Sequence, residues 1–394
     1  MSVAGQRVRV LIVDDSAFMR KVLQSIIATD PQLEIVGEAR DGREAIAMAE
    51  SLRPDVISMD IMMPHVDGLQ ATEAIMSKNP RPIVIVSSEA KDGAEPTLRA
   101  LELGAIDFVP KPSSGIDLDM NSIRDEICRK LKMAARVRVV RTAKSFSAPV
   151  QAPPENNPYT KSPLAAGGNG NGNGTAKVGG GASGNGNGAR PRPAANGRHP
   201  VVVIASSTGG PQTLMQLIPA IPRDFPGTIL LVQHMPGTFT AQFSKQLAEV
   251  SGLYVKEAAH GDELRPGTIL VCPGSHHLRV TGSGRIDLQE GERINGYRPC
   301  ADIALETAAA FAGPMCVGVI LTGMGGDGAK GVQAVKAGGG HVIAQNEETA
   351  VIFGMPAEAI KTGSVDQILG IESIAATLEK RAMYLMGASK VGAM

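Results

Sequence analysis

Short apolar runs alternate with amphipathic stretches along the first third of the chain. The runs are rich in Val and Ile, which favour strands, whereas the stretches between them repeat apolar residues with the period of a helix. The runs are RVRVLIVDD, LEIVGEA, DVISMD, PIVIVSS and AIDFVPK, and the stretches include FMRKVLQSIIATD and GREAIAMAESL. This order predicts an α/β domain of the (βα)5 type, with a parallel sheet covered by helices on both faces.

The same alternation returns after residue 198. The apolar runs are now VVVIASS, TILLVQHM, TILVCPG, MCVGVILTGMG and GHVIAQN, and the helical stretches include TFTAQFSKQLAEV, ADIALETAAAFAG and GVQAVKAGG. We therefore predict a second α/β domain, doubly wound and mostly parallel. No sequence repeat relates the two halves.

A segment with almost no large apolar side chains separates the two halves. Its first part is rich in proline, and its second part is rich in glycine and asparagine. Such a composition cannot bury enough apolar surface to offset the entropy of ordering the chain. We therefore divide the chain into a first domain at residues 1–141, a flexible linker at 142–198 and a second domain at 199–394.

Composition argues against several functional classes, namely nucleic-acid-binding, membrane and secreted proteins. Lys and Arg together number 39, as do Asp and Glu, so no overall field favours nucleic acid or an anionic membrane. The four cysteines are far apart in the sequence and form no C-x-x-C pair, so we expect reduced core residues. The N-terminus lacks the pattern of a signal peptide, and no apolar run approaches the length of a membrane span. These features predict a cytoplasmic protein without membrane insertion.

Charged and hydroxyl side chains end the strands predicted in the first half. Asp14 and Asp15 end the first strand, Asp60 the third, Ser87 the fourth and Lys111 the fifth. Because the carboxyl ends of parallel strands form one edge of the sheet, these groups should gather there. Three crowded carboxylates repel one another and are consistent with a bound Mg²⁺ ion. Such an ion, with a lysine nearby, would also neutralise a phosphoryl group on a carboxylate.

Three strand ends of the second half carry a hydroxyl, an imidazole and a carboxylate. Ser207 follows the strand VVVIAS, His234 ends LLVQ, and Asp327 lies in a glycine-rich turn after GVILTG. Together they could supply a nucleophile, a general base and the group that orients the base. Each has an ordinary alternative when taken alone: a helix cap for the serine, a core histidine for His234 and a turn residue for Asp327.

Other motifs of the second half compete with this interpretation. The pattern Gly323-x-Gly325-x-x-Gly328 follows a strand, and Glu347 lies about 20 residues further on, as in a dinucleotide-binding fingerprint. That alternative leaves Ser207 and His234 without a role. The neighbouring histidines His276 and His277 should point to opposite faces of an extended segment and so cannot easily share a metal ion. Arg298 could face the site or the solvent.

The first half resembles the response-regulator receiver family. VLIVDDSAFMRKVL, DVISMDIMMPHVDGL, IVIVSS and GAIDFVPKP carry this resemblance over most of residues 7–130. It implies that Asp60 is phosphorylated, that Asp14 and Asp15 help to hold Mg²⁺, and that Lys111 pairs with the phosphoryl oxygens. Ser87 then occupies the switch hydroxyl position. Phe108 stands near the switch aromatic position of the family, or else is a core aromatic of the last strand.

The second half resembles the CheB family of chemotaxis protein-glutamate methylesterases through about residues 199–385. The motifs are IASSTGGPQTL, VQHMPGTFT, CPGSHH, NGYRPCAD, GVILTGMGGDGAKG and VIAQNEETAVIFGMP. The resemblance implies that Ser207 is the nucleophile, His234 the base, Asp327 the orienting carboxylate and the Met324 backbone N–H an oxyanion donor. The chain departs from the family at Ala205-Ser206, where Gly-Ala is expected.

The function implied by the two resemblances is a serine hydrolase activated by phosphorylation. It would demethylate glutamate methyl esters and deamidate glutamine side chains on the cytoplasmic helices of chemotaxis receptors. A CheA-type histidine kinase would donate the phosphoryl group, and the second domain would need no cofactor. The main alternative is a response regulator that docks on receptors without catalysing a reaction.

Overall fold

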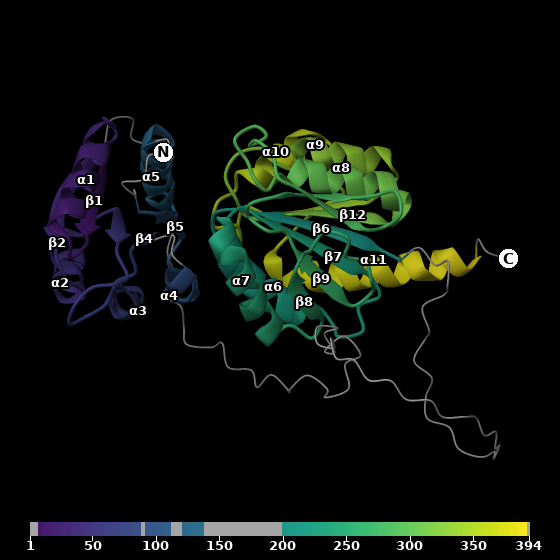
Figure 1. Ribbon diagram of the computed structural model, residues 1–394, viewed down its shortest axis with the longest axis horizontal. Coiled ribbons are helices and arrows are strands. Elements are labelled where there is room, and N and C mark those ends of the chain that lie inside the picture. The colour runs from purple at the N-terminus through teal and green to yellow at the C-terminus, as the bar shows by residue number, and fades with distance from the viewer. Residues whose placement is uncertain (1–6, 88–90, 112–119, 138–198, 392–394) are drawn as a thin grey trace, which may run out of the picture. The chain divides into compact units, whose positions relative to one another are not determined.

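The computed structural model describes residues 7–87, 91–111, 120–137 and 199–391 (Figure 1). The predicted linker at 142–198 lies outside these ranges. The described residues form two parallel sheets of five and seven strands and one two-stranded antiparallel ribbon. Within the described ranges, no helix combines the length and the apolar character that crossing a membrane requires.

The first sheet has the strand order β2-β1-β3-β4-β5, and all its neighbours are parallel. Its strands are β1 (Val8–Val13), β2 (Leu33–Ala39), β3 (Val56–Met59), β4 (Ile83–Ser87) and β5 (Asp107–Pro110). The helices are α1 (Ala17–Ala28), α2 (Gly42–Leu52), α3 (Gly68–Lys78), α4 (Lys91–Glu102) and α5 (Met120–Ala134). The predicted (βα)5 architecture is therefore confirmed.

Alternating apolar side chains place the helices of the first domain on both faces of its sheet. Val10 and Ile12 of β1 belong to the buried cluster that contains α1 and α5, whereas Leu11 and Val13 belong to the cluster that contains α2, α3 and α4. Successive strand residues point to opposite faces, so a run that is apolar at every position must be covered twice. This explains why β1 shows no polar alternation at its centre.

The sequence also sets where these helices begin. Ser16 caps α1 by accepting the Met19 N–H, and Asp41 caps α2 by accepting two backbone N–H groups. At α3, Asp67 and Gln70 form a capping box, in which each side chain accepts a backbone N–H of the other residue. These caps satisfy donors that a helix leaves free in its first turn.

The second sheet has the order β14-β13-β12-β6-β7-β9-β8 and is parallel throughout. Its strands are β6 (Val201–Ser206), β7 (Thr228–Gln233), β8 (Tyr254–Glu257), β9 (Thr268–Val271), β12 (Cys316–Ile320), β13 (His341–Gln345) and β14 (Gln367–Leu369). The chain starts in the middle at β6 and extends the sheet first to one side and then to the other. The doubly wound, parallel prediction is confirmed.

Helices cover both faces of the second sheet (Figure 1). One face packs against α6 (Gly210–Leu217), α7 (Gly237–Val250) and α11 (Ile371–Val391), and the other against α8 (Ala301–Ala312), α9 (Ala329–Ala337) and α10 (Met355–Lys361). Short 3-10 turns, η1 (Ile218–Ala220) and η2 (Gly313–Met315), follow α6 and α8. Val201 and Val203 of β6 face α8, whereas Val202 and Ile204 face α6.

Four strands of the second domain were not predicted from the sequence. They are the short edge strands β8 and β14 and the antiparallel ribbon of β10 (His277–Val280) and β11 (Ile286–Gln289). Each has three or four residues and contains polar side chains, so none forms the apolar run that identified the central strands. The ribbon matters because it leads into the segment at 290–300 that reaches the candidate site.

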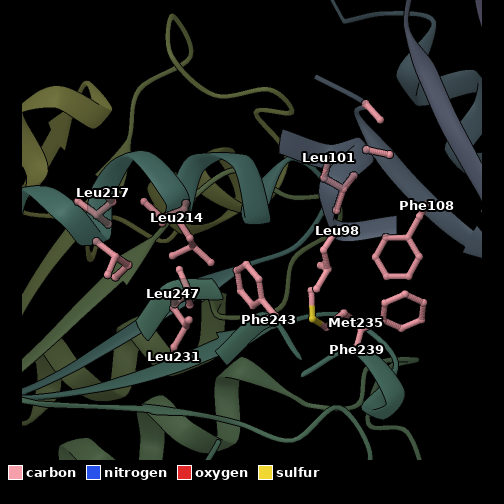
Figure 2. Close-up of a cluster of buried hydrophobic side chains, with 14 of the residues drawn as sticks. Leu98, Leu101, Phe108, Leu214, Leu217, Leu231, Met235, Phe239, Phe243 and Leu247 are labelled. Carbon is pink, nitrogen blue, oxygen red and sulfur yellow. The ribbon is translucent and has the colours of Figure 1, made fainter. Parts of the chain in front are cut away.

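One buried cluster draws on both α/β domains. It includes Leu98 and Leu101 of α4 and Phe108 of β5, together with Phe239 and Phe243 of α7 (Figure 2). The rings of Phe108 and Phe239 are tilted by 42° with their centroids 4.5 Å apart. Of the two alternatives for Phe108, the structure places it as a buried core aromatic, with 4% of its surface exposed.

Candidate functional sites

The acidic group of the first domain assembles around one lysine. Lys111 Nζ lies 2.8 Å from Oδ2 of Asp14 and 2.8 Å from Oδ2 of Asp60. Asp14 follows β1 and Asp60 follows β3, which are neighbouring strands, and both carboxyl groups are buried. Asp15 is exposed, yet one of its carboxylate oxygens lies within 4.8 Å of oxygens of the other two. The structure therefore brings together the three predicted acids and the predicted lysine.

Ser87 lies at the same edge of the sheet. It is the last residue of β4, it is buried, and its carbonyl accepts the Lys111 N–H at 2.7 Å. Ser88, the second serine of that strand end, lies outside the described residues. The backbones of Ser87 and Lys111 are therefore neighbours at this edge.

The carboxylates in this pocket repel one another because they outnumber the one lysine. Burial raises the pKa of Asp60, the Asp14 charge raises it further, and Lys111 opposes both effects without cancelling them. Burial lowers the pKa of Lys111, but hydrogen bonds to the two carboxylates and their charges outweigh burial, so the ammonium is retained. A further positive charge would stabilise the ionised form of a carboxylate whose pKa is raised.

The donor set fits Mg²⁺. The buried Oδ2 atom of Asp14 lies 2.8 Å from Lys111 Nζ and shares that ammonium with Asp60. Carboxylate oxygens are the ligands that Mg²⁺ prefers, and Asp15 is accessible to solvent, from which the ion would bring its waters. An ion held by Asp14, Asp15 and Asp60 would reduce the repulsion among the three carboxylates.

The two serines of the IASSTGG stretch occupy different environments. Ser206 is the last residue of β6 and is fully buried, whereas Ser207 is partly exposed in the turn before α6. Helix α6 begins at Gly210 with Pro211 next, and Gly209 ahead of it has a φ of +75°, a conformation that favours glycine. The strand-to-helix turn therefore exposes Ser207 and buries Ser206.

His234 follows β7, the strand next to β6. The two strands pair with Ser206 opposite Gln233, so Ser207 and His234 come next in register at the carboxyl edge of the sheet. The His234 N–H donates to the Ser206 carbonyl at 3.0 Å, which continues the pairing by one residue. Adjacent strands lie ~5 Å apart, so the nucleophile and the base predicted from the sequence are neighbours.

Asp327 reaches His234 from the turn between β12 and α9. Its Oδ2 atom lies 2.7 Å from His234 Nε2, and it also accepts the Ala301 N–H at 2.7 Å. Its Oδ1 atom accepts the Asp302 N–H at 3.0 Å and the Cys300 thiol at 3.2 Å. The carboxylate thus binds His234 and caps the N-terminus of α8, where a negative charge is stabilised.

The charge state of Asp327 fixes the tautomer of His234. Burial raises the pKa of Asp327, but the hydrogen bond and charge of His234 and the N–H groups of Ala301 and Asp302 lower it below its usual value. An ionised carboxylate only accepts hydrogen bonds, so the proton of neutral His234 is on Nε2. The other nitrogen, Nδ1, is buried without a hydrogen-bond partner. Its lone pair is therefore available to a neighbouring hydroxyl.

The glycine-rich turn after β12 lies directly against Ser207. The Ser207 N–H donates to the Thr322 carbonyl at 3.0 Å, and a β-carbon on Gly323 would be 2.8 Å from Ser207 Cβ. Glycine is required at 323 for this approach. Met324, the predicted oxyanion donor, directly follows Gly323 in the chain.

Sequence reasoning missed two residues of the 290–300 segment. The Tyr297 ring stacks on His234 with centroids 4.8 Å apart and an angle of 20° between the planes. Burial and the Asp327 charge raise the pKa of Tyr297, so its hydroxyl remains protonated. Cys300 donates its thiol to Asp327, and burial with the nearby Asp327 charge raises its pKa to about 12. The motif NGYRPCAD contained both residues but gave no signal of their partners.

The competing motifs are placed as follows. Gly325 of the dinucleotide-like pattern is covered by Tyr297, whose hydroxyl would be 1.8 Å from a β-carbon there, and Asp327 within the pattern is bound to His234. His276 bonds Ser275 and lies near Glu290, whereas His277 is buried against the Glu292 carbonyl, so the two histidines do not share a partner. Arg298 donates to the Gly291 carbonyl.

The second acidic group, Cys300, Asp302 and Asp327, differs from the first. Its ligand atoms also lie within 4.8 Å of one another. Here, however, backbone N–H groups already occupy the carboxylate oxygens, with Gly331 N–H donating to Asp302 at 2.8 Å. The four cysteines are all buried and free, which confirms the expectation of reduced core residues. This group is therefore explained by hydrogen bonding within the protein.

Comparisons with known proteins agree with both resemblances. A family model described as CheB methylesterase matches residues 202–378, and one described as response regulator receiver domain matches residues 10–121. The chain is 42% identical to a protein-glutamate methylesterase/protein-glutamine glutaminase of Pyrococcus horikoshii, over 100% of this chain and 98% of that protein.

A relative of the same name from Symbiobacterium thermophilum is also 42% identical, over 93% of this chain and 95% of its own length. Among solved structures, the CheB methylesterase catalytic domain of Thermotoga maritima is 43% identical, with a TM-score of 0.45. That match covers 46% of this chain and 98% of the solved one.

Proposed function

We propose, from the premise that this chain belongs to the family of CheB methylesterases joined to a response regulator receiver domain, that it hydrolyses glutamate methyl esters on chemotaxis receptors. Ser207 is the nucleophile, His234 the general base and Asp327 the group that orients the base. Glutamine side chains of the same receptors are the second substrate. The activity is raised by phosphorylation of Asp60.

One observation carries the catalytic assignment. His234 binds the ionised Asp327 through Nε2 and keeps a buried Nδ1 without a partner, at a strand end adjacent to that of Ser207. A lone pair held in this way is positioned to accept a proton from a neighbouring hydroxyl. The buried Nδ1 of His277 also lacks a partner, but His277 binds a backbone carbonyl through Nε2 and so has no ionised carboxylate to orient it.

The reaction divides into two steps. Ser207 Oγ attacks the ester carbonyl carbon as its proton passes to His234 Nδ1, and collapse of the tetrahedral species releases methanol, which takes that proton. Water then attacks the acyl-enzyme, again with His234 as base, and releases a glutamate side chain and the free serine. Asp327 stabilises the imidazolium formed in both steps through its bond to Nε2.

The oxyanion would be stabilised by the backbone N–H of Met324. This assignment rests on the contact between Gly323 and Ser207, which brings that peptide beside the reacting atoms. Preorganised N–H donors act most strongly in a water-poor site, and removing one such donor from a serine hydrolase costs about 10²–10³ in kcat. A glutamine amide differs from the ester only in its leaving group, so ammonia would leave in place of methanol.

The receiver domain would control this chemistry through Asp60. A CheA-type histidine kinase transfers a phosphoryl group to one Asp60 oxygen, and Lys111 pairs with the added negative charge. A Mg²⁺ ion held by Asp14, Asp15 and Asp60 would supply charge neutralisation during the transfer. The raised pKa of Asp60 and the single lysine that Asp14 and Asp60 share support this role for the pocket.

Two contacts support communication between the receiver and Ser207. Thr208, next to the proposed nucleophile, donates its hydroxyl to Asp107 at the start of β5. Phe108, which follows Asp107 in the chain, contacts Phe239 near the start of α7. Both receiver residues lie on β5, which Lys111 directly follows, so a phosphoryl group bound to Lys111 can alter their contacts by a short path. Phosphorylation would then shift the population towards an arrangement in which Ser207 is accessible.

Methanol release from a methylated receptor by the purified full-length protein tests the activity. Ser207→Ala should lower kcat by more than about 10³-fold, because no nucleophile remains. Ser206→Ala is the matched control, since it removes a buried hydroxyl one residue away, and it should lose far less. If the wild type released no methanol but still bound receptor, the chain would be a docking module. Equal losses in the two variants would contradict the assignment of Ser207.

A further inference from the structure

We propose that Gln233 is a positioning residue that holds the backbones of Ser207 and His234 in their reactive arrangement. The inference rests on the proposed function, because it concerns the same serine and histidine. Gln233 is the last residue of β7, directly before His234, and only 2% of its surface is exposed. A buried amide at the end of an otherwise apolar strand requires partners, and its partners here are the two proposed catalytic residues.

The amide of Gln233 joins three residues. Its Nε2 atom donates to the Ser207 carbonyl at 2.9 Å and to the His234 carbonyl at 3.0 Å. Its Oε1 atom accepts the Ser206 hydroxyl at 2.6 Å. Both N–H groups of the amide are therefore used, one for the residue that carries the nucleophile and the other for the residue that carries the base.

The orientation of the amide follows from its partners. Two carbonyl oxygens can only accept hydrogen bonds, so the NH₂ group must face them, while the Ser206 hydroxyl can donate to the remaining oxygen. A rotated amide would place Oε1 against two carbonyls. Ser206 thus acts on the site indirectly. Its hydroxyl fixes the orientation of the Gln233 amide, and that amide fixes Ser207 and His234.

The second glycine of IASSTGG, Gly210, makes room for this amide. A β-carbon on Gly210 would lie 2.0 Å from Gln233 Oε1 and 2.9 Å from Ser206 Cβ. The Gly210 N–H also donates to the Ser207 carbonyl at 2.8 Å, so that carbonyl accepts from the helix start and from Gln233 together. The first turn of α6, the end of β7 and the exposed serine are therefore tied into one unit.

This unit sets the distance between the attacking oxygen and the base. Ser207 and His234 follow separate strands. Their N–H groups still bond the neighbouring strands, through the Thr322 and Ser206 carbonyls, and the Gln233 amide binds both of their carbonyls. A shift of about 1 Å in such a pair can cost about 10²-fold in rate, although the substrate still binds. Loss of the Gln233 donors should therefore lower kcat and leave KM nearly unchanged.

Gln345 provides a matched control. It is also a buried glutamine at the end of a strand, β13, and its amide also binds backbone: Oε1 accepts the Thr322 N–H at 2.8 Å and Nε2 donates to the Thr349 carbonyl at 3.0 Å. Gln345 binds neither the Ser207 nor the His234 carbonyl, but its partner Thr322 accepts the Ser207 N–H, so Gln345 acts on the serine only through an intervening residue. A Gln→Met change at either position keeps the length of the side chain and removes the amide.

The test compares full-length Gln233→Met and Gln345→Met in three measurements. These are kcat and KM for methanol release, the rate at which a fluorophosphonate labels Ser207, and the thermal unfolding midpoint. We expect both variants to unfold at lower temperature. The labelling rate and kcat should fall by about tenfold or more in Gln233→Met and by clearly less in Gln345→Met, with KM within about twofold of the wild type.

Three results would overturn the positioning role. They are a Gln233→Met enzyme with the wild-type labelling rate, an equal loss in Gln345→Met, or a loss confined to KM. If Gln233→Met does not fold, Gln233→Glu replaces it: its ionised side chain keeps the shape but opposes both carbonyls, so its labelling rate relative to the wild type should fall as pH rises. A ratio independent of pH would contradict the proposal.

The proposed function can fail separately. A wild type that neither releases methanol nor reacts with the fluorophosphonate at Ser207 overturns both proposals. A wild type that does both, alongside a Gln233→Met variant that matches it, overturns only the role of Gln233.

Discussion

Two aspartates at the carboxyl edges of two parallel sheets have opposite electrostatic surroundings. Asp60 of the receiver is buried beside a second carboxylate with one lysine between them, and its pKa is raised. Asp327 of the methylesterase domain is buried as well, but its pKa is lowered. Burial acts in the same direction on both, so the difference arises from the donors that surround each carboxylate.

The donors differ in number and in kind. Asp327 accepts from His234, from two backbone N–H groups at the start of α8 and from the Cys300 thiol. Asp60 accepts one backbone N–H, from Ile61, and shares Lys111 with Asp14. The fixed donors around Asp327 suit the carboxylate that our proposal keeps ionised through the reaction, whereas the fewer donors around Asp60 suit the carboxylate that our proposal assigns to phosphorylation.

Replacement of Asp327 by asparagine should give the largest effect. Asparagine offers one acceptor oxygen in place of two, so its NH₂ group must face either His234 or the start of α8. If it faces His234, it donates to Nε2 and moves the imidazole proton to Nδ1, where no base remains for Ser207. We expect kcat for methanol release to fall about 10³–10⁴-fold, as for a triad with the wrong tautomer.

Asp302→Asn is the matched control for that variant. Asp302 is a buried neighbour whose side chain accepts the Gly331 N–H and has a pKa raised by burial, and its side chain has no bond to His234. Its replacement should change kcat far less, as measured by the same assay. Equal losses in the two variants would mean that Asp327 acts only by capping α8.

Replacement of Asp60 by asparagine should make the folded protein more stable near pH 7. Because the folded-state pKa of Asp60 is raised, this group contributes stability that is present below its unfolded pKa and is lost as pH rises through the folded value. Asparagine does not titrate. In EDTA, the thermal midpoint of Asp60→Asn should therefore exceed that of the wild type near pH 7 by a few degrees, and the difference should shrink as the solution is acidified.

The same variant should lose its response to a phosphodonor but retain unstimulated methanol release, because the catalytic residues are in the other domain. Adding Mg²⁺ should raise the midpoint of the wild type, since the ion binds the folded pocket, and should raise that of Asp60→Asn less. A variant less stable than the wild type at neutral pH in EDTA would contradict the electrostatic account. Phosphate found on another residue would contradict the choice of Asp60.

Strand-end reasoning predicted the charged centres of both domains because apolar runs locate strands, and parallel strands place their next residues at one edge. Asp14, Asp60 and Lys111 follow from this argument alone, and so does the proximity of Ser207 and His234. The central strands were found for the same reason. The short polar strands β8 and β14 lacked that signal.

Partners that arrive from distant loops could not be predicted in this way. Tyr297 stacks on His234 because a turn between Ile294 and Tyr297 turns the segment towards the site, and Cys300 meets Asp327 because α8 begins there. The choice of Nε2 for Asp327 depends on the path of the turn after β12. Such contacts are set by tertiary packing, which no local periodicity records.

The smallest effect is expected from Cys300→Ala, which removes one of the four donors to Asp327. A thiol is a weak donor, so its loss should cost about 0.5 kcal/mol, or about twofold in kcat. Asp327 contributes stability that is lost as pH falls through its lowered pKa, and with one donor fewer this loss should begin at a higher pH. Cys300→Ser restores a hydroxyl donor and should return both the kcat and the acid limb of thermal unfolding towards the wild type. If serine and alanine behaved alike, the thiol would only fill space. The ionised state of Asp327 would then depend on His234 and the two backbone donors alone.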